Sequence, residues 1–158
     1  IRQGADFGYS TDPFAMVRTH YDKTRRKLYI FGEIYGIQIF NREIANRIKK
    51  RGYNDFPVVF DSAEPKSIDE IYTLGVDARR AIKGKGSVEF GSKWLGELNE
   101  IIIDPIRCPN TAREFESADF EVDRWGNTLP RIQDKDNHSI DATRYALGEE
   151  MIGSVYSF

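Results

Sequence analysis

Three strand-like segments stand close together at the beginning of the chain, and the shortness of their connections limits how the fold can start. Residues 2–9, 13–21 and 26–35 are rich in the aromatic and β-branched residues that β-strands favour. Turn-forming residues separate them at 10–13 and 22–24. Strands joined by connections this short pair side by side in antiparallel order. The sequence therefore predicts an antiparallel meander of three strands.

Helix and strand patterns alternate after this meander. The first expected helix carries Ile44, Ala45 and Ile48 on one face, as an amphipathic helix does. The expected helices cover residues 41–50, a segment opening at 64–68, 87–95, 111–117 and 137–151, the expected strands cover 58–60, 76–82 and 100–103, and a hairpin is expected over 120–132. This order predicts an α/β domain of the ribonuclease H-like kind, with a mixed central sheet flanked by helices and a late β-hairpin.

Length and composition fit one globular domain. The 158 residues, 40% of them hydrophobic, are enough to form a core. No apolar run approaches the roughly 20 residues that span a bilayer, and no signal peptide opens the chain, so no membrane partner is expected. Ile1 stands where a complete protein has Met, which indicates a piece of a longer protein. The single cysteine, Cys108, excludes an intramolecular disulfide, fits a reducing compartment and indicates a small buried hydrophobe.

The net charge of −2 gives no overall attraction to nucleic acid, so a role on DNA would need local clusters of Lys and Arg. Residues 25–27 indicate a hairpin turn, and the basic residues of 47–51 indicate the polar face of a helix. The third cluster differs, because Lys83-Gly84-Lys85-Gly86 is a flexible loop that could follow a phosphate backbone. A plain exposed turn is the alternative. The candidate DNA-binding residues of this cluster are Arg79, Arg80, Lys83 and Lys85.

Three aspartates, far apart in the sequence, occupy positions from which a fold could bring them together. Asp6 follows the first strand pattern, between Gly4 and Gly8. Asp61 ends an apolar strand, where α/β folds place ligand sites. Asp141 lies inside a helical stretch, where a charged side chain needs a partner. Carboxylates at two strand ends and on a facing helix are the oxygen ligands that a hard divalent cation prefers.

Each of these residues also has a structural explanation. Asp6 could form a turn, and Asp61 could cap the helix that opens near Pro65. His138 lies three residues before Asp141, so the two share a helical face, and a histidine there can ligate metal, orient water or carry a proton. The alternative for His138 is a hydrogen-bonded residue at a helix N-terminus. His20 is expected to be structural, and no Cys/His set has zinc spacing.

Phosphodiester hydrolysis explains why several carboxylates would gather. The reaction needs an activated water, stabilisation of an anionic transition state and stabilisation of the leaving oxygen. Two divalent metal ions about 3.5–4 Å apart supply all three, with a carboxylate bridging them. The sequence therefore favours metal-dependent cleavage, with Asp6, Asp61, Asp141 and His138 as catalytic candidates and the three aspartates as metal ligands.

Three stretches, residues 4–13, 60–68 and 138–147, resemble the C-terminal nuclease domain of tailed-bacteriophage terminase large subunits. The segment formed by residues 108–111 and 114–116 is also similar to that family. The resemblance runs over residues 3–151 in the family's order. It implies a ribonuclease H-like fold and a Mg²⁺- or Mn²⁺-dependent endonuclease that cuts concatemeric viral DNA. By motif match, Asp6, Asp61 and Asp141 would bind metal and His138 would assist, while the stretch around 84–86 would lie near the DNA.

The family's full-length proteins also carry an N-terminal packaging ATPase domain, which nothing in residues 1–158 matches. The resemblance implies that ATPase domain, double-stranded DNA, the portal and the small terminase subunit as partners, in the host cell cytoplasm. Two other functions stay open at this point. Asp6, Gly8, Ser10 and Thr11 resemble the phosphate loop of an actin-like phosphotransferase, which ATP binding would support. A non-enzymatic module that docks on DNA or the portal would bind without cleaving.

Overall fold

The computed structural model describes residues 1–8 and 10–155, and its centre is a sheet of six strands in the order β5-β4-β1-β2-β3-β6. Residue 9, which belongs to the first expected strand and the first motif, lies outside the described residues. The strands are β1 (Arg2–Asp6), β2 (Phe14–Asp22), β3 (Lys27–Gly36), β4 (Val58–Phe60), β5 (Ala78–Arg80) and β6 (Glu100–Ile103).

The first three strands form the expected antiparallel meander, with Gly4 opposite Val17 on β1 and β2 and Val17 opposite Glu33 on β2 and β3. The remaining strands of this sheet are parallel to their neighbours. β4 pairs with β1, β5 with β4, and β6 with β3. The predicted mixed central sheet is therefore confirmed.

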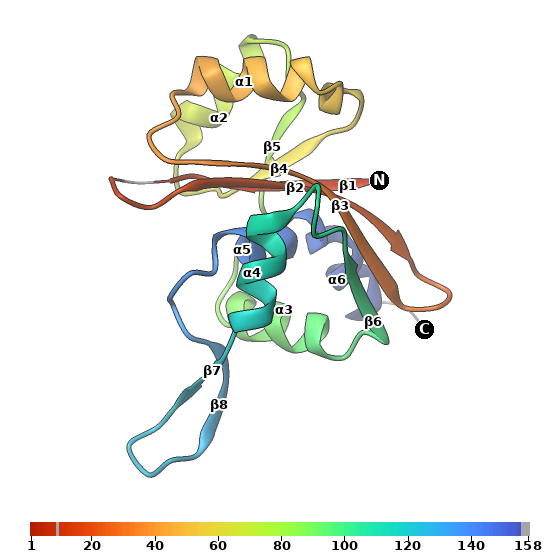
Figure 1. Cartoon of the computed structure of the whole chain (residues 1–158), viewed down its shortest axis with the longest axis vertical. Coiled ribbons are helices and arrows are strands. Elements are labelled where there is room, and N and C mark those ends of the chain that lie inside the picture. The colour runs from red at the N-terminus through yellow and green to blue at the C-terminus, as the bar shows by residue number, and fades with distance from the viewer. Residues whose placement is uncertain (9, 156–158) are drawn as a thin grey trace.

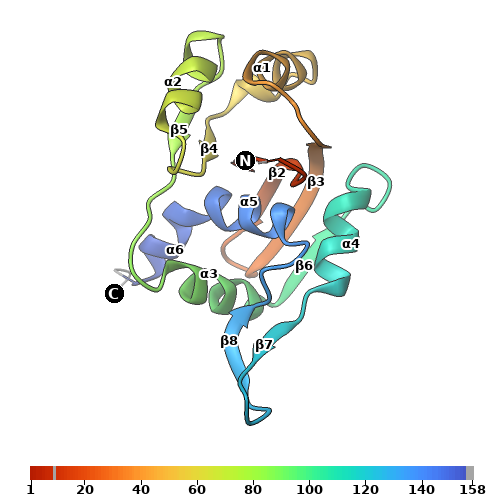
Figure 2. The same cartoon turned by 90° about the vertical axis from the view of Figure 1, so that its left-hand side faces the viewer.

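Helices cover both faces of this sheet (Figure 1). The helical elements are α1 (Asn41–Lys50), a short 3-10 turn (Tyr53–Asp55), α2 (Pro65–Thr73), α3 (Ser87–Gly96), α4 (Pro109–Ser117), α5 (His138–Ala146) and α6 (Gly148–Val155). Helices α1 and α2 lie on one face, and α3 to α6 lie on the other, with α5 nearest the strands (Figures 1 and 2). The late hairpin, β7 (Phe120–Val122) and β8 (Thr128–Ile132), projects away from the body. No helix within residues 1–8 and 10–155 has the length and apolar character needed to cross a membrane.

The two faces of the sheet bury separate hydrophobic clusters. Side chains of β1, β2 and β4 pack against α1 and α2, with Phe14, Phe60 and Ile44 among the buried residues. On the other face, β2 and β3 pack against α3, α5 and α6, where Cys108 is fully buried as expected. This double coverage explains why β4 carries apolar residues throughout its length.

Several expected elements differ in their limits, such as the first strand, which ends at Asp6 rather than at residue 9. The helix expected over 137–151 is two helices, because α5 ends at Ala146 and α6 begins at Gly148. The break at Leu147 lets both helices reach the same cluster, where Leu147 and Met151 are buried. The strand expected over 76–82 pairs only at Ala78–Arg80, because its partner β4 offers three residues for pairing.

Helix α5 crosses β1 in direct contact, and Gly4 makes that contact possible. A Cβ atom at Gly4 would stand 2.1 Å from the Ala142 carbonyl oxygen and 2.5 Å from the Ala146 nitrogen. Only a residue without a side chain fits between strand and helix at this distance. This contact fixes the depth of α5 over β1, and therefore the position of the side chains that α5 presents to the end of that strand.

Candidate metal centre

The three aspartates come from two neighbouring strand ends and a helix that packs on one of those strands. Asp6 is the last residue of β1, and Asp61 directly follows the parallel neighbour β4. The Asp61 backbone N–H donates to the Ala5 carbonyl at 3.2 Å, which holds the two strand ends together. Asp141 comes from α5, which packs on β1. The charges of Asp61 and Asp141 both act on Asp6.

Asp6 is the least exposed of the three, with its side chain 13% exposed against 19% for Asp61 and 21% for Asp141. Burial raises the pKa of Asp6 above its ordinary value, the neighbouring His138 opposes that change, and the negative charges of Asp141 and Asp61 add to it. The carboxylate is therefore held in a place where its charge is only partly compensated. An added cation would stabilise the ionised form.

His138 is the first residue of α5 and lies between two carboxylates. Its Nδ1 is 3.6 Å from Asp6 Oδ2, and its Nε2 is 3.9 Å from Asp12 Oδ1. The adjacent Asp6 carboxylate raises the pKa of His138. The structure therefore brings His138 to the aspartates, rather than leaving it as a helix-terminal residue alone.

Asp141 has its basic partner on its own helix, one turn further on. Arg144 donates to Asp141 Oδ1 from Nη2 at 2.7 Å and from Nε at 3.3 Å. Burial raises the pKa of Asp141, and the Arg144 guanidinium counteracts this. The charge inside the helix, which needed a partner on sequence grounds, has one in Arg144.

Asp61 has a basic partner that comes from a different segment, the loop between β5 and α3. Lys83 Nζ forms an ion pair with Asp61 Oδ1, which also accepts the Ala63 backbone N–H at 3.1 Å. The expectation that Asp61 could cap the next helix is wrong, because Glu64 holds the N-cap position of α2 and Asp61 bonds within its own turn. Lys83 was predicted to bind DNA, and the structure places it on a carboxylate of the site.

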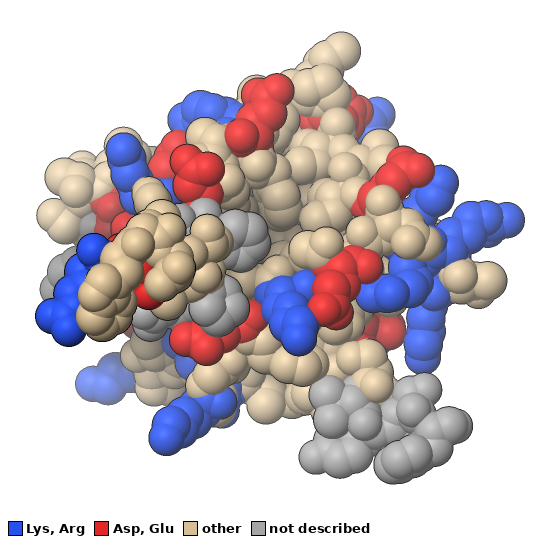
Figure 3. Space-filling view, turned by 90° about the horizontal axis from the view of Figure 1, so that it is seen from below, with Lys and Arg blue, Asp and Glu red and all other residues tan. Residues whose placement is uncertain are grey.

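The rest of the predicted DNA-binding cluster points elsewhere. Arg79 pairs with Asp77 at 3.1 Å, and Arg80 contacts Asp69 at 3.5 Å. The two are successive residues of β5, so their side chains leave the strand on opposite faces. Lys85 is exposed two residues beyond Lys83. In the view from below, Lys and Arg are mixed with Asp and Glu over most of the face, and basic side chains gather at its right-hand edge (Figure 3).

Tyr145 was not singled out from the sequence, yet it stands among the three carboxylates. Burial raises the pKa of Tyr145, and the charges of Asp6, Asp61 and Asp141 raise it further. Lys83 Nζ lies 5.8 Å from its ring centroid and Arg144 Cζ 5.4 Å. Tyr145 follows Asp141 by four residues in α5 and so shares its helical face, a spacing from which its place in the site could have been found.

Glu114 is a second residue that the sequence did not single out. It is fully buried in α4 and accepts the backbone N–H groups of Ser139 at 2.7 Å and Ile140 at 3.4 Å. Tyr35 also donates its hydroxyl to Glu114 at 2.8 Å. Burial raises the pKa of Glu114 to about 7, while these bonds act in the opposite direction. Glu114 satisfies the open N-terminus of the helix that carries His138 and Asp141.

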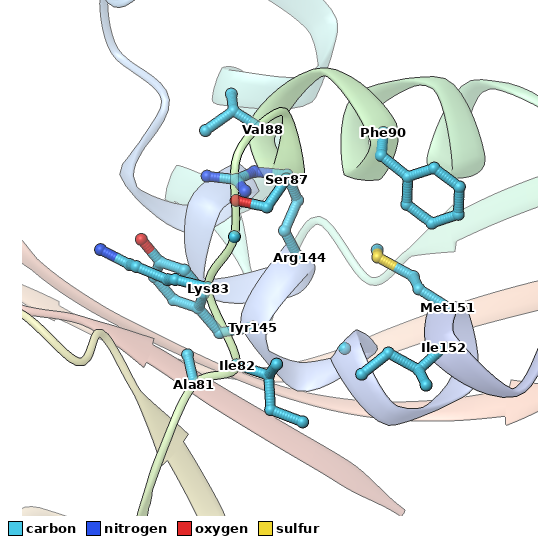
Figure 4. A pocket seen from close by; sticks show the side chains of 12 residues that line it. Ala81, Ile82, Lys83, Ser87, Val88, Phe90, Arg144, Tyr145, Met151 and Ile152 are labelled. Carbon is cyan, nitrogen blue, oxygen red and sulfur yellow. The ribbon is translucent and has the colours of Figure 1, made fainter.

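A cavity of about 330 Å³ lies next to the carboxylates, between the 81–86 loop and helices α3, α5 and α6. Lys83, Tyr145 and Arg144 form its polar side, and side chains such as Phe90 and Ile152 form its apolar side (Figure 4). None of the three aspartates lines it.

The donor set fits a hard divalent cation in kind, because three carboxylates approach one another at a partly buried site. Their arrangement is not closed around an ion. Within residues 1–8 and 10–155, no group of three or more His, Cys, Asp or Glu side chains is placed to hold a metal. Each carboxylate instead faces a basic partner, Asp6 with His138, Asp61 with Lys83 and Asp141 with Arg144.

The chain was compared with known families, and residues 6–149 match the terminase RNAseH like domain. The chain belongs to this family. A curated relative, the large terminase subunit of Bacillus phage SPP1, is 46% identical over 153 residues, covering 96% of this chain and 36% of the relative. The PBSX phage terminase large subunit of Bacillus subtilis is 29% identical over 149 residues, covering 94% of this chain and 34% of the relative. The terminase domain described here therefore spans about a third of the length of these relatives.

Solved structures agree with the family assignment. The large terminase nuclease domain of bacteriophage SPP1, crystallised with bound Mn, has a TM-score of 0.91 and 45% identity, covering 94% of this chain and 85% of that chain. The large terminase nuclease domain of phage P22 has a TM-score of 0.71 and 19% identity, covering 94% of this chain and 80% of that chain, and shows the shared fold. The predicted ribonuclease H-like fold is thus confirmed.

Proposed function

We propose that residues 1–158 form a divalent-metal-dependent endonuclease domain that cuts double-stranded viral DNA during genome packaging. The observation that carries the proposal is the convergence of Asp6, Asp61 and Asp141 at one end of the sheet, next to His138. Membership of a terminase family, and a relative described as a nuclease domain with bound Mn, support it. Mg²⁺ or Mn²⁺ is the proposed cofactor, with two ions per site.

In this proposal, Asp6, Asp61 and Asp141 hold the ions. Bound divalent ions would activate the attacking water and stabilise negative charge on the phosphate and the departing 3′ oxygen. Asp6 supplies a carboxylate from a rigid strand end, and Asp61 supplies one from the turn after β4. His138, which faces Asp6, is placed to hold a proton beside that carboxylate. The protein's own contribution is the fixed placement of these groups.

Sequence specificity should be low. Recognition of base edges commonly uses a helix or ribbon that enters the major groove, and the candidate contacts here are instead basic side chains suited to phosphates. Arg79, Arg80, Lys83 and Lys85 are the proposed phosphate-binding residues. The side chains of Arg79 and Arg80 leave β5 on opposite faces. These two residues would therefore not contact the same stretch of the DNA backbone at once.

The context of the whole protein is also a proposal. The chain covers 36% of a relative described as a large terminase subunit. We expect an adjoining packaging ATPase domain, with the portal and the small terminase subunit as assembly partners in the host cytoplasm. Concatemeric viral DNA would then be the substrate, cut where packaging starts and ends.

Plasmid nicking by the 158-residue chain tests the proposal. Asp6→Asn, Asp61→Asn and Asp141→Asn should each lower Mn²⁺-dependent nicking of supercoiled DNA by at least about a hundredfold, because each removes a charged ligand. Circular dichroism and urea unfolding would check that each variant is folded.

Asp22→Asn is a matched control. Its carboxylate is also paired with a basic side chain and is 20% exposed, against 19% for Asp61, but it lies at the opposite end of β2 from the site. Nicking by this variant should equal that of the unmodified chain. Full activity in any of the three site variants would remove that aspartate from the centre, and DNA binding without cleavage under every metal would favour a docking module instead.

A further inference from the structure

Lys83 is the most movable of the basic groups that face the three carboxylates. Its side chain is 43% exposed, whereas that of Arg144 is 8% exposed. Arg144 reaches Asp141 from the same helix, three residues away. Lys83 instead reaches Asp61 from a separate loop, and the two residues are 22 positions apart in the sequence.

The loop that carries Lys83 is tied to the sheet at its start, and Lys83 makes its packing contact with Tyr145. Its start is fixed by the Ala81 N–H, which donates to the Phe60 carbonyl at 2.8 Å. Its end is closed by the Ser87 N–H, which donates to the Gly84 carbonyl at 3.1 Å. Cβ atoms built at Gly84 and Gly86 meet no atom within 4 Å, and the Ile82 side chain between these anchors is 69% exposed. Lys83 can therefore move without disturbing the core.

A divalent cation and the Lys83 ammonium would compete for the same carboxylate. The ammonium sits on Asp61 Oδ1, and that oxygen already accepts the Ala63 N–H. A divalent ion on the remaining oxygen would stand within a few ångströms of the ammonium, where like charges repel strongly at a partly buried site. The ion can bind well only if Lys83 leaves.

We infer that Lys83 is an exchangeable counter-cation of Asp61, which pairs with the carboxylate in the absence of metal and is displaced when a divalent cation binds. This inference rests on the proposed metal centre. It makes Lys83 a positioning residue, because its ammonium is delivered to the edge of the site when the metal arrives. Figure 4 shows the Lys83 amine and the Tyr145 hydroxyl at the same side of the cavity, so the displaced ammonium stays near the reacting groups. A DNA phosphate brought to the metal would then lie within reach of this ammonium.

Lysine side-chain NMR on the unmodified chain tests the exchange directly. Mg²⁺ is titrated in without DNA, and the Nζ and Cε signals of Lys83 and Lys85 are followed. The Lys83 signals should shift with the same midpoint as Mg²⁺ binding measured by calorimetry. Lys85, two residues further along the same loop, should shift little and serves as the internal control. A Lys83 signal that stays unchanged at saturating Mg²⁺ overturns the inference.

Metal affinity provides a second measurement. Lys83→Met should tighten Mn²⁺ binding roughly threefold to tenfold, because the ion no longer has to break a partly exposed ion pair. Mn²⁺ binding would be measured by electron paramagnetic resonance, which does not depend on DNA cleavage. Lys85→Met removes the same charge from the same loop and should change the Mn²⁺ dissociation constant less than twofold.

The outcomes separate this inference from the proposed function. Equal effects of Lys83→Met and Lys85→Met would mean that only the general charge of the loop matters, and the inference fails. Mn²⁺ binding that is unaffected by either variant also overturns it, while leaving the metal centre in place. If the unmodified chain binds neither Mn²⁺ nor Mg²⁺, the proposed metal centre itself fails.

Discussion

The candidate metal centre has two halves that are built differently. One half joins the end of β1 to helix α5 and contains Asp6, His138, Asp141 and Arg144. Gly4 lets that helix rest directly on the strand. The other half consists of the turn after β4 and the 81–86 loop, which meet through the ion pair of Asp61 and Lys83. The first half is fixed by buried backbone contacts. In the second half, backbone bonds fix Asp61 to β1, and only Lys83 is held by a partly exposed ion pair.

This difference combines a fixed geometry with a charge that can be exchanged. A rigid half fixes two carboxylates relative to the sheet, which positions reacting groups well. The loop half contributes the third carboxylate together with a cation that can leave. Carboxylates gathered at one place repel one another, and the basic partners offset that repulsion; in the proposed metal centre, a bound ion would take over this role. The two halves should therefore respond differently to substitution.

Gly4→Ala should have the largest effect, because it forces the rigid half apart. The new Cβ would overlap the backbone of α5, and backbone atoms cannot turn away as a flexible side chain can. We expect a loss of about 3 kcal/mol in the free energy of unfolding and a matching loss of nicking activity. Urea denaturation measures the first and the plasmid assay the second.

Gly148→Ala is the control for that substitution. It places the same methyl group at the start of α6, where no atom lies within 4 Å of the built Cβ. Stability should change by less than about 0.5 kcal/mol. If the two alanine variants were equally stable, α5 would not be seated on β1 in the way described.

The two cations give the next contrast. Arg144→Met leaves Asp141 buried without its partner and should lower the free energy of unfolding by about 2–3 kcal/mol. Lys83→Met breaks a more exposed pair and should cost no more than about 1 kcal/mol. Both measurements would use urea unfolding with EDTA present, so that metal does not contribute. Equal costs for the two variants would contradict the division into a fixed and a movable half.

Glu114 makes the rigid half sensitive to pH. Its pKa is raised to about 7 by burial, so between about pH 4 and pH 7 the native state binds a proton that the unfolded chain has released. The contribution to stability is complete below this interval and is lost as pH rises through about 7. The unfolding free energy should fall by about 1–2 kcal/mol across the interval relative to Glu114→Gln, which cannot titrate. Parallel pH profiles of the two proteins would show that Glu114 is not protonated in the native state.

Much of the fold could be predicted because its determinants are local. Short connections define the β1 to β3 meander. Asp6 and Asp61 stand at strand ends, and helical spacing puts His138 and Asp141 on one face of α5. The break at Leu147 was not predictable in the same way, because it depends on the cluster that both α5 and α6 must reach.

The partners of the site residues were harder to predict than the residues themselves. Lys83 meets Asp61 because β5 lies beside β4 and its following loop returns over the strand ends, which is a tertiary fact. Glu114 accepts a hydrogen bond from the start of α5 because α4 packs against α5. No pattern within residues 109–117 predicts that contact. Sequence reasoning therefore missed the groups that neutralise and orient the three aspartates.

The smallest expected effects lie in the 81–86 loop. Alanine substitutions at its two glycines distinguish the effect of a steric clash from the effect of backbone strain. Cβ atoms at Gly84 and Gly86 both meet open space, but only Gly86 has a positive φ, of 77°. Gly84→Ala should therefore change the unfolding free energy by less than about 0.5 kcal/mol, and Gly86→Ala should cost about 1 kcal/mol. Thermal and urea unfolding of both variants measure the difference. A large loss for Gly84→Ala would mean that contacts hold the loop in place, in which case the half of the site that carries Lys83 would be as fixed as the half that carries Arg144.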